Sequence, residues 1–188
     1  LDGTAIGGGG ADLYAANPSS ATNPTASGAN AVAIGTNAQA TNTNAVAITR
    51  NAVASGTSSF AVGNNAAATG VNAIAIGSNT DAAERSVAIG GAGAQALTTN
   101  TTAIGSSSSS QPATIPSGGS GGTIALGGSY ASGTDSFAAA IANNTSTYGA
   151  TGTGSVAIGT RVTATQTHSI ALGHQAYARG SHTVAIGY

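Results

Sequence analysis

Three histidines near the C-terminus are the residues of this chain best suited to hold a metal ion. His168 and His182 are 14 residues apart, and His174 lies between them. A zinc site needs about four ligands, drawn from His, Cys, Asp, Glu or water. The chain contains no Cys, and no Asp or Glu follows Asp135. We therefore expect no metal site and no cofactor, and we interpret the histidines as turn residues.

Catalytic arrangements are also poorly supported. The sequence has no Gly-x-Ser-x-Gly motif in a strand-to-helix context, so a serine hydrolase is disfavoured. The Gly-rich runs at 7–10 and 118–122 lack the Gly-Lys-Ser/Thr ending of a phosphate-binding loop. A carbohydrate-processing solenoid enzyme would need clustered carboxylates, whereas the chain has five acidic residues at scattered positions. We expect a protein that is not an enzyme.

Arginine and tyrosine are the better candidates for recognition, because both are enriched at binding interfaces. Tyr177 and Arg179 are two residues apart, so they lie on one face of a strand. Arg161 precedes them at a turn. We consider these three as candidate ligand-binding residues. The alternative is that they only solvate or brace the fold.

Composition limits the class of protein. Of 188 residues, 5% are charged and 4% aromatic, there is no Cys, Met or Trp, and 29 are Gly. Hydrophobic residues still make up 40%, which argues against disorder. The net charge of −1, with four Lys or Arg in total, gives no basic surface for nucleic acid. No apolar run approaches the roughly 20 residues of a spanning helix, so we expect no direct membrane insertion by this segment.

One apolar phrase, first seen at Ala31-Val32-Ala33-Ile34-Gly35, recurs along the chain. Its copies are 14 residues apart over two stretches. They begin at Val32, Val46, Phe60 and Ile74, and again at Val156, Ile170 and Val184. A fixed period of this kind indicates a solenoid. An Ala-x-Ala element between the copies supplies a second strand in each coil, so the sequence predicts an all-β, parallel β-solenoid of 14-residue coils.

A column of turn residues supports the coil. It lies two residues before Val32 and the equivalent residue of each later copy, and it consists mainly of residue types that tolerate positive φ. Its members are Asn30, Asn44, Ser58, Asn72, Arg85, Asn100, Gly122, Asp135, Gly154, His168 and His182. We expect a left-handed backbone corner at these positions.

The two faces of the first strand are assigned as follows. Val32 and Ile34 lie on one face and Ala31 and Ala33 on the other. Since neither face is polar, we expect both to be buried, with Val and Ile filling the roll and Ala admitting a neighbouring chain. The expected roll core is Val32, Ile34, Val46, Ile48, Ile74, Ile76, Val87, Ile89, Val156, Ile158, Ile170, Leu172, Val184 and Ile186. The expected chain contacts are Ala33, Ala47, Ala75, Ala157 and Ala171.

Three segments depart from the repeat. Residues 1–22 break the pattern and are interpreted as an irregular N-terminal cap. The Ser/Pro/Gly-rich stretch at 106–123 is predicted to be an inserted, protruding loop within the repeat region 23–188. The copy at 136–142 fits the period only with a bulge, and its register is ambiguous.

The repeated phrase resembles the Asn-Ser-Val-Ala-Ile-Gly repeat in the head domain of YadA-like trimeric autotransporter adhesins. The clearest copies are Asn72-Ala73-Ile74-Ala75-Ile76-Gly77, Arg85-Ser86-Val87-Ala88-Ile89-Gly90 and Gly154-Ser155-Val156-Ala157-Ile158-Gly159. The resemblance covers about residues 23–188. It implies a left-handed parallel β-roll in which three identical chains form one trimeric β-prism.

The resemblance also implies a function in cell adhesion and virulence. Such heads are exposed on the Gram-negative outer membrane as part of a longer anchored protein. They bind host extracellular matrix proteins such as collagen, fibronectin or laminin, or a host cell receptor. No copy here reads Asn-Ser-Val-Ala-Ile-Gly in full. The alternative is a structural spacer, a rod that holds another binding tip away from the cell surface.

Overall fold

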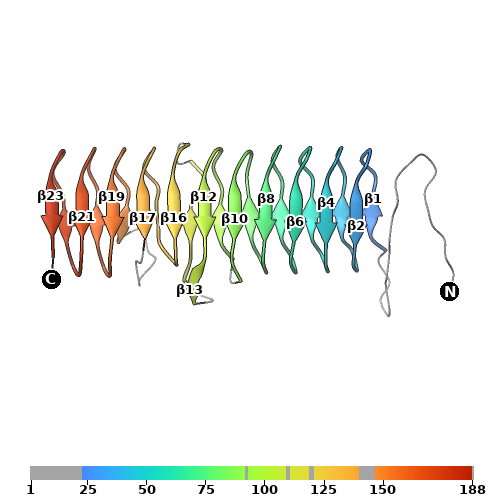
Figure 1. Cartoon of the computed structure of the whole chain (residues 1–188), viewed down its shortest axis with the longest axis horizontal. Helices are drawn as coiled ribbons and strands as arrows, with labels where there is room; N and C mark the ends of the chain where they lie inside the picture. Colours follow the sequence, from blue (N-terminus) through green and yellow to red (C-terminus); the bar gives the residue numbers. More distant parts are fainter. Residues whose placement is uncertain (1–22, 92, 109–110, 119–120, 140–146, 188) are drawn as a thin grey trace.

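The chain folds as a row of stacked coils that forms an elongated rod (Figure 1). The computed structural model describes residues 23–91, 93–108, 111–118, 121–139 and 147–187. The predicted N-terminal cap at 1–22 lies outside the described residues. No helix in these ranges is long and apolar enough to cross a membrane.

Each coil contributes one strand to a long sheet of parallel three-residue strands. Its strands, in spatial order, are β2 (Val32–Ile34), β4 (Val46–Ile48), β6 (Phe60–Val62), β8 (Ile74–Ile76), β10 (Val87–Ile89), β12 (Thr102–Ile104), β16 (Ile124–Leu126), β17 (Phe137–Ala139), β19 (Val156–Ile158), β21 (Ile170–Leu172) and β23 (Val184–Ile186). Every strand therefore pairs with the next copy of the apolar phrase.

The opposite wall of the roll is made of two-residue strands, and we call it the outer wall. Its first sheet contains β1 (Thr25–Ala26), β3 (Gln39–Ala40), β5 (Val53–Ala54), β7 (Ala67–Ala68), β9 (Asp81–Ala82), β11 (Gln95–Ala96) and β15 (Thr114–Ile115). Parallel bridges at Tyr130 and Ala131 lead on to β18 (Gly149–Ala150), β20 (Thr163–Ala164) and β22 (Tyr177–Ala178). The predicted solenoid of about 14 residues per coil is confirmed.

The predicted turn column is confirmed at all eleven positions. Its nine non-glycine residues have φ between 52° and 60°, and Gly122 and Gly154 are also positive. A second corner column has the same conformation and contains Asn37, Asn51, Asn65, Asn79, Arg161 and Gln175, with φ from 52° to 58°. Asn tolerates this left-handed region better than most residues, which explains why it is the commonest residue type at both corners.

The predicted assignment of the strand faces is wrong. Ala33, Ala47, Ala75, Ala157 and Ala171 are each 0% exposed inside the roll, so they do not contact a neighbouring chain. The side chains expected in the roll core point outward instead. These outward residues are Val32, Ile34, Val46, Ile48, Ile74, Ile76, Val87, Ile89, Val156, Ile158, Ile170, Leu172, Val184 and Ile186, none of which is buried.

The physical reason for the reversal is the width of the coil. The outer wall presents Ala inward as well, at positions such as Ala38, Ala40, Ala52 and Ala54. Two short strands closed by two tight corners leave room between the walls mainly for methyl groups, and close packing fills that space with few larger side chains, such as Ile115 and Val162. The alternation along each strand is as predicted, but the two sides are exchanged.

Small hydroxyl residues complete the interior near the corners. Ser59 Oγ donates to the carbonyl oxygen of Gly56 at 2.7 Å, and Ser169 Oγ donates to that of Gln166 at 2.7 Å. Thr101 Oγ1 makes the equivalent bond to Thr98 at 2.7 Å. Because most buried hydroxyls in proteins are paired, such bonds also stabilise the corner backbone, although the buried Ser155 Oγ makes none to the described residues.

The insertion is organised differently from the predicted loop at 106–123. Its first part forms an antiparallel pair of β13 (Ser106–Ser108) and β14 (Gln111–Pro112). The chain then returns to the outer wall as β15, which pairs in register with β11. Thr123 is already buried in the roll. The described part of the copy at 136–142 also has a regular register, since Phe137 pairs with Ile124 and Val156, while residues 140–142 lie outside the described residues.

Candidate functional site

The outward face of the long sheet carries a continuous apolar stripe. It is formed by the first and third residues of the long-sheet strands, which point away from the roll interior. Its members are Val32, Ile34, Val46, Ile48, Phe60, Val62, Ile74, Ile76, Val87, Ile89, Thr102, Ile104, Ile124, Leu126, Phe137, Ala139, Val156, Ile158, Ile170, Leu172, Val184 and Ile186. With a strand spacing of ~4.8 Å, the stripe is roughly 50 Å long.

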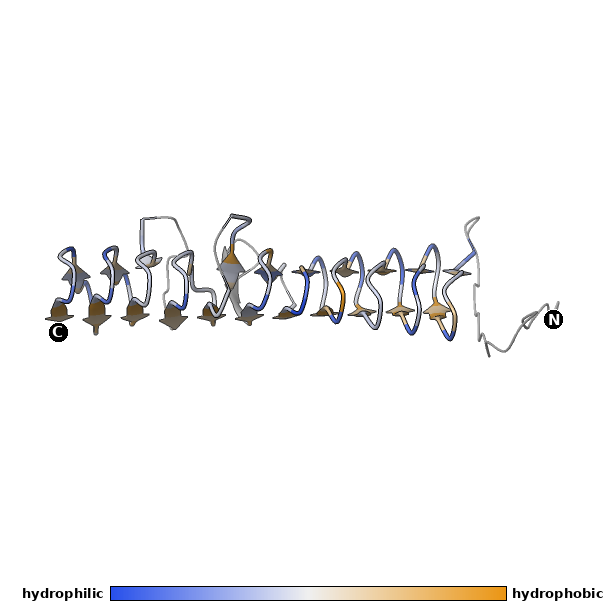
Figure 2. Cartoon of the chain, turned by 90° about the horizontal axis from the view of Figure 1, so that it is seen from above, coloured by the Kyte–Doolittle hydropathy of each residue, from blue (hydrophilic) through white to orange (hydrophobic). Residues whose placement is uncertain are grey.

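The stripe is open to solvent in the single chain. Phe60 is 37% exposed and Ile158 is 38% exposed, although both are large apolar residues. Figure 2 shows apolar residues on the strands and hydrophilic residues at many of the turns. A contiguous apolar patch of this size marks an interaction surface on a soluble protein. The stripe can therefore associate with another apolar face, and it carries no group that could do acid–base chemistry.

The candidate ligand-binding residues fall into two places. The guanidinium carbon of Arg179 lies 5.0 Å from the centroid of the Tyr177 ring, within cation–π range. Tyr177 is 43% exposed, on the outward side of β22. Arg161 lies at a corner before β20, the strand that pairs with β22. The structure thus brings Tyr177 and Arg179 into contact and places Arg161 one coil earlier.

The two corner histidines lie against each other on adjacent coils. His168 Nδ1 and His182 Nε2 are 3.3 Å apart, and the ring centroids are 5.1 Å apart. This contact extends a pattern seen elsewhere in the same column, where Asn30 donates to Asn44 at 3.3 Å. His174 lies at a different turn. Within the described ranges, no three residues of the His, Cys, Asp or Glu type come together as a metal site would require.

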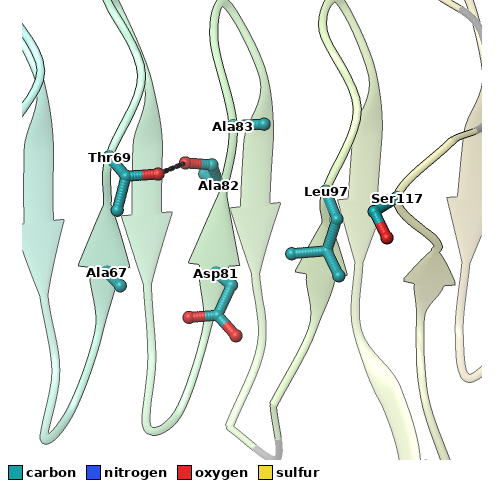
Figure 3. A pocket seen from close by; sticks show the side chains of 7 residues that line it. All are labelled: Ala67, Thr69, Asp81, Ala82, Ala83, Leu97 and Ser117. Atoms are coloured by element: carbon teal, nitrogen blue, oxygen red, sulfur yellow. Dashed lines mark hydrogen bonds between the residues drawn. The ribbon is translucent and has the colours of Figure 1, made fainter.

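Sequence reasoning missed a groove on the outward side of the outer wall (Figure 3). It has a volume of about 310 Å³. Its lining is formed by Ala67, Thr69, Asp81, Ala82, Ala83, Leu97 and Ser117. The signal in the sequence was weak, because it consists only of two small outward residues, Ala67 and Ala83, beside a larger apolar residue.

Asp81 is the ionisable group of this groove. Burial raises the pKa of its carboxyl above the ordinary value, and a hydrogen bond from the Gln95 side chain opposes part of that rise. Arg85, four residues further along the chain, is engaged elsewhere. Its Nη1 lies 3.4 Å from Glu84 Oε1, and its Nε donates to Asn100 Oδ1 at 2.9 Å. The groove therefore combines a mainly apolar lining, which also includes the hydroxyl residues Thr69 and Ser117, with one carboxylate.

Comparison with known proteins agrees with this architecture. The family model for the YadA head domain repeat matches residues 26–48, 54–80, 83–108, 150–161 and 164–188. A comparison with curated proteins gave no match. The matched segments cover more than half of the chain, and each contains the strand-and-corner pattern described above. The chain therefore belongs to the YadA head domain repeat family.

Proposed function

We propose that this chain is the non-enzymatic head of a trimeric autotransporter adhesin. In this proposal it is exposed on a Gram-negative outer membrane as part of a longer anchored protein. It attaches the cell to host extracellular matrix proteins, such as collagen, fibronectin or laminin, or to a host cell receptor. Membership of the YadA head family supports adhesion, and the apolar stripe is the observation that carries the assembly.

The stripe is the surface through which three copies pack. Its side chains are nearly all Val, Ile, Leu or Phe, and the hydrophobic effect favours removing them from water. The partner that matches the stripe along its whole length is another copy of the same chain, since it has the same coil spacing. Three stripes facing a common axis make a prism with Val and Ile in the centre and the Ala-filled rolls around it.

This packing determines which surfaces of the trimer remain exposed to solvent. The outer wall lies on the opposite side of each roll from the stripe, so its outward residues remain in solvent. The Tyr177–Arg179 pair and the groove at Asp81 are both on that wall. Three copies of each surface in one particle would let weak contacts add up through avidity. Arg161, Tyr177 and Arg179 remain our candidates for direct ligand contact.

A structural spacer is the second candidate function. It is favoured by the regularity of the rod, in which the Asn ladder and the Ala interior repeat from coil to coil. Such a rod would hold another binding tip away from the cell without binding a ligand itself. Adhesin and spacer share the same fold and the same assembly.

A solid-phase binding assay separates the two functions. The purified chain is tested against immobilised collagen, fibronectin and laminin after light scattering has established its oligomeric state. The adhesin predicts saturable binding to at least one of them, and weaker binding by a Tyr177→Ala, Arg179→Ala double variant. Gln39→Ala is the matched control, because Gln39 lies on the outward side of the same wall. Absence of saturable binding to all three proteins would favour the spacer.

A further inference from the structure

The groove on the outer wall is built around one missing side chain. Thr69, Ala83 and Leu97 follow equivalent strand positions on three adjacent coils, because Ala68 pairs with Ala82 and Ala82 with Ala96. The backbone keeps this register beyond the strands, with Thr69 N donating to Ala82 O at 3.1 Å and Ala83 N donating to Ala96 O at 2.9 Å. Ala83 is therefore a short residue between two longer ones, and the space above it is the groove.

The second side of the groove is formed by the neighbouring column of the same wall. Ala67 and Asp81 pair directly in β7 and β9, so another methyl group lies beside the Asp81 carboxylate (Figure 3). Ser117, which follows the insertion and β15, closes the end near Leu97. The site thus has an alanine floor, an end formed by Leu97 and Ser117, and a single carboxylate.

The Asp81 carboxylate in the groove has no cationic partner among the described residues of the single chain. Among the described residues, the one ion pair found joins Arg85 to Glu84, so no cation neutralises Asp81 there. Its recorded hydrogen-bond partner is the neutral Gln95 side chain. A partly buried carboxylate without a cation bears a desolvation cost that an incoming positive charge would offset.

We propose that the groove binds a basic side chain, arginine or lysine, from an extended partner protein. The aliphatic part of that side chain lies over Ala83 against Leu97, and its cationic end meets the Asp81 carboxylate. Long basic side chains are suited to such a site because they bury their stems while pairing their charged ends. The volume of about 310 Å³ is at the small end for ligand sites and fits one side chain.

This inference deepens the proposed adhesin function, because it names the chemistry by which an outward face would hold a host protein. A trimer would present three such grooves, each on a surface that the stripe does not use. An extended host chain with several basic residues could then engage more than one groove, which would raise its apparent affinity.

The test uses two short Gly/Ser peptides that differ at one position. One carries a central arginine, and the other carries citrulline, which has a similar shape without the charge. Each is titrated into the isotopically labelled 188-residue protein while backbone amide signals are followed by NMR. We expect the arginine peptide to shift the amides of Asp81, Ala83 and Leu97, and to bind about 10-fold more tightly than the citrulline peptide.

Three variants locate the effect. Asp81→Asn should abolish the preference for arginine over citrulline. Ala83→Leu should block both peptides by filling the floor of the groove while keeping Asp81. Asp135→Asn is the matched control, since it removes the same charge at an exposed corner outside the groove and should leave binding unchanged. Equal affinity for both peptides, unchanged binding by Ala83→Leu, or an equal loss in Asp135→Asn would overturn the proposal.

The outcome is separable from that of the adhesin proposal. If the peptide does not bind but the protein still binds a matrix protein, the groove assignment alone is wrong. If the arginine peptide binds at the groove but no matrix protein is held, the groove stands and the adhesin function fails. If both bind and Asp81→Asn weakens both, the groove is part of the adhesive surface.

Discussion

The side-chain amide of Asn37 donates a hydrogen bond to Oδ1 of Asn51, 3.0 Å away on the next coil. The same bond joins Asn51 to Asn65 and Asn65 to Asn79, again at 3.0 Å. Each of these residues has φ between 56° and 58°. One residue type therefore does two things at this corner, since it adopts the left-handed backbone and ties successive coils together.

Substitutions at Asn51 should separate these two contributions. Asn51→Gly keeps the backbone conformation and loses both ladder bonds, and we expect a cost of about 1 kcal/mol in the free energy of unfolding. Asn51→Ala adds the penalty of the left-handed region, about 1 kcal/mol more. Urea unfolding measures both. If the two variants were equally stable, the backbone conformation would not explain the preference for Asn.

Ala75 and Ile76 are neighbours on opposite faces of β8, and they should respond to substitution in different ways. Ala75 is 0% exposed in the roll interior, so Ala75→Leu overpacks the space between the walls. We expect a loss of at least about 2 kcal/mol, seen as a lower melting temperature. The matched Ile76→Leu variant conserves volume on the outward face and should melt close to the wild type. Comparable losses in both variants would mean that the interior has room to spare.

Ile76→Asp addresses assembly. The substitution places a charge in the middle of the apolar stripe, where burial against another copy would leave it unpaired. We expect light scattering to show smaller species than the trimer proposed for the wild type, while far-ultraviolet circular dichroism remains typical of β-structure. Gln39→Asp, on the outward side of the other wall, is the control and should keep the oligomeric state of the wild type. If Ile76→Asp kept the wild-type oligomeric state and Gln39→Asp lost it, the outer wall would be the interface.

The raised pKa of Asp81 predicts how the stability difference between Asp81→Asn and the wild type depends on pH. Above that pKa the carboxylate is charged in both states, and the folded state alone bears the desolvation cost. Asp81→Asn should therefore melt at a higher temperature than the wild type at pH 7. The gain should shrink as the pH falls through the raised pKa and disappear below the ordinary value of 3.8, where both states are neutral. Thermal melts across this range would contradict us if the variant were less stable at pH 7.

Glycine is required at one type of corner and not at another. Gly159 has φ of 125°, and a Cβ there would lie 2.0 Å from the carbonyl oxygen of Gly173 on the next coil. We expect Gly159→Ala to destabilise the fold by about 2 kcal/mol or more. A Cβ at Gly91 would meet nothing within 4 Å, so Gly91→Ala should be tolerated. Similar melting temperatures for the two variants would show that the coils separate easily.

Much of this fold could be predicted from the sequence because its period is carried by residue types with strong local preferences. Asn, Gly, Asp and His at the corner column indicated positive φ, and even Arg85 obeys that pattern with φ of 52°. Where the 14-residue period holds, as from Val32 to Ile74, the spacing alone predicted the strand register, but it left the copy at 136–142 ambiguous. The insertion was harder, since Thr114 and Ile115 return to the outer wall within a stretch whose composition is typical of a loop.

The strand faces could not be assigned by hydrophobicity, because both are apolar. The volume of the side chains decides which face is directed into the roll. The Ala-x-Ala element, for example Ala38-Gln39-Ala40, puts methyl groups on the inner side of one wall, and the opposite wall must match that narrow space. The groove at Asp81 was hidden for another reason. It depends on which outward residues are adjacent on successive coils, and on how Ser117 returns after the insertion.

The uneven coil lengths have a wider consequence. The step from Ile74 to Val87 is one residue short and the step from Val87 to Thr102 is one residue long, yet the strands on both sides remain paired in register. The corners accommodate the changes in length. The alternation of inward-facing and outward-facing residues along each strand is therefore preserved. Such a rod is modular. Lineages can lengthen it, shorten it or add a hairpin at a corner without rebuilding either of its faces, so its reach and its surface decoration can evolve independently.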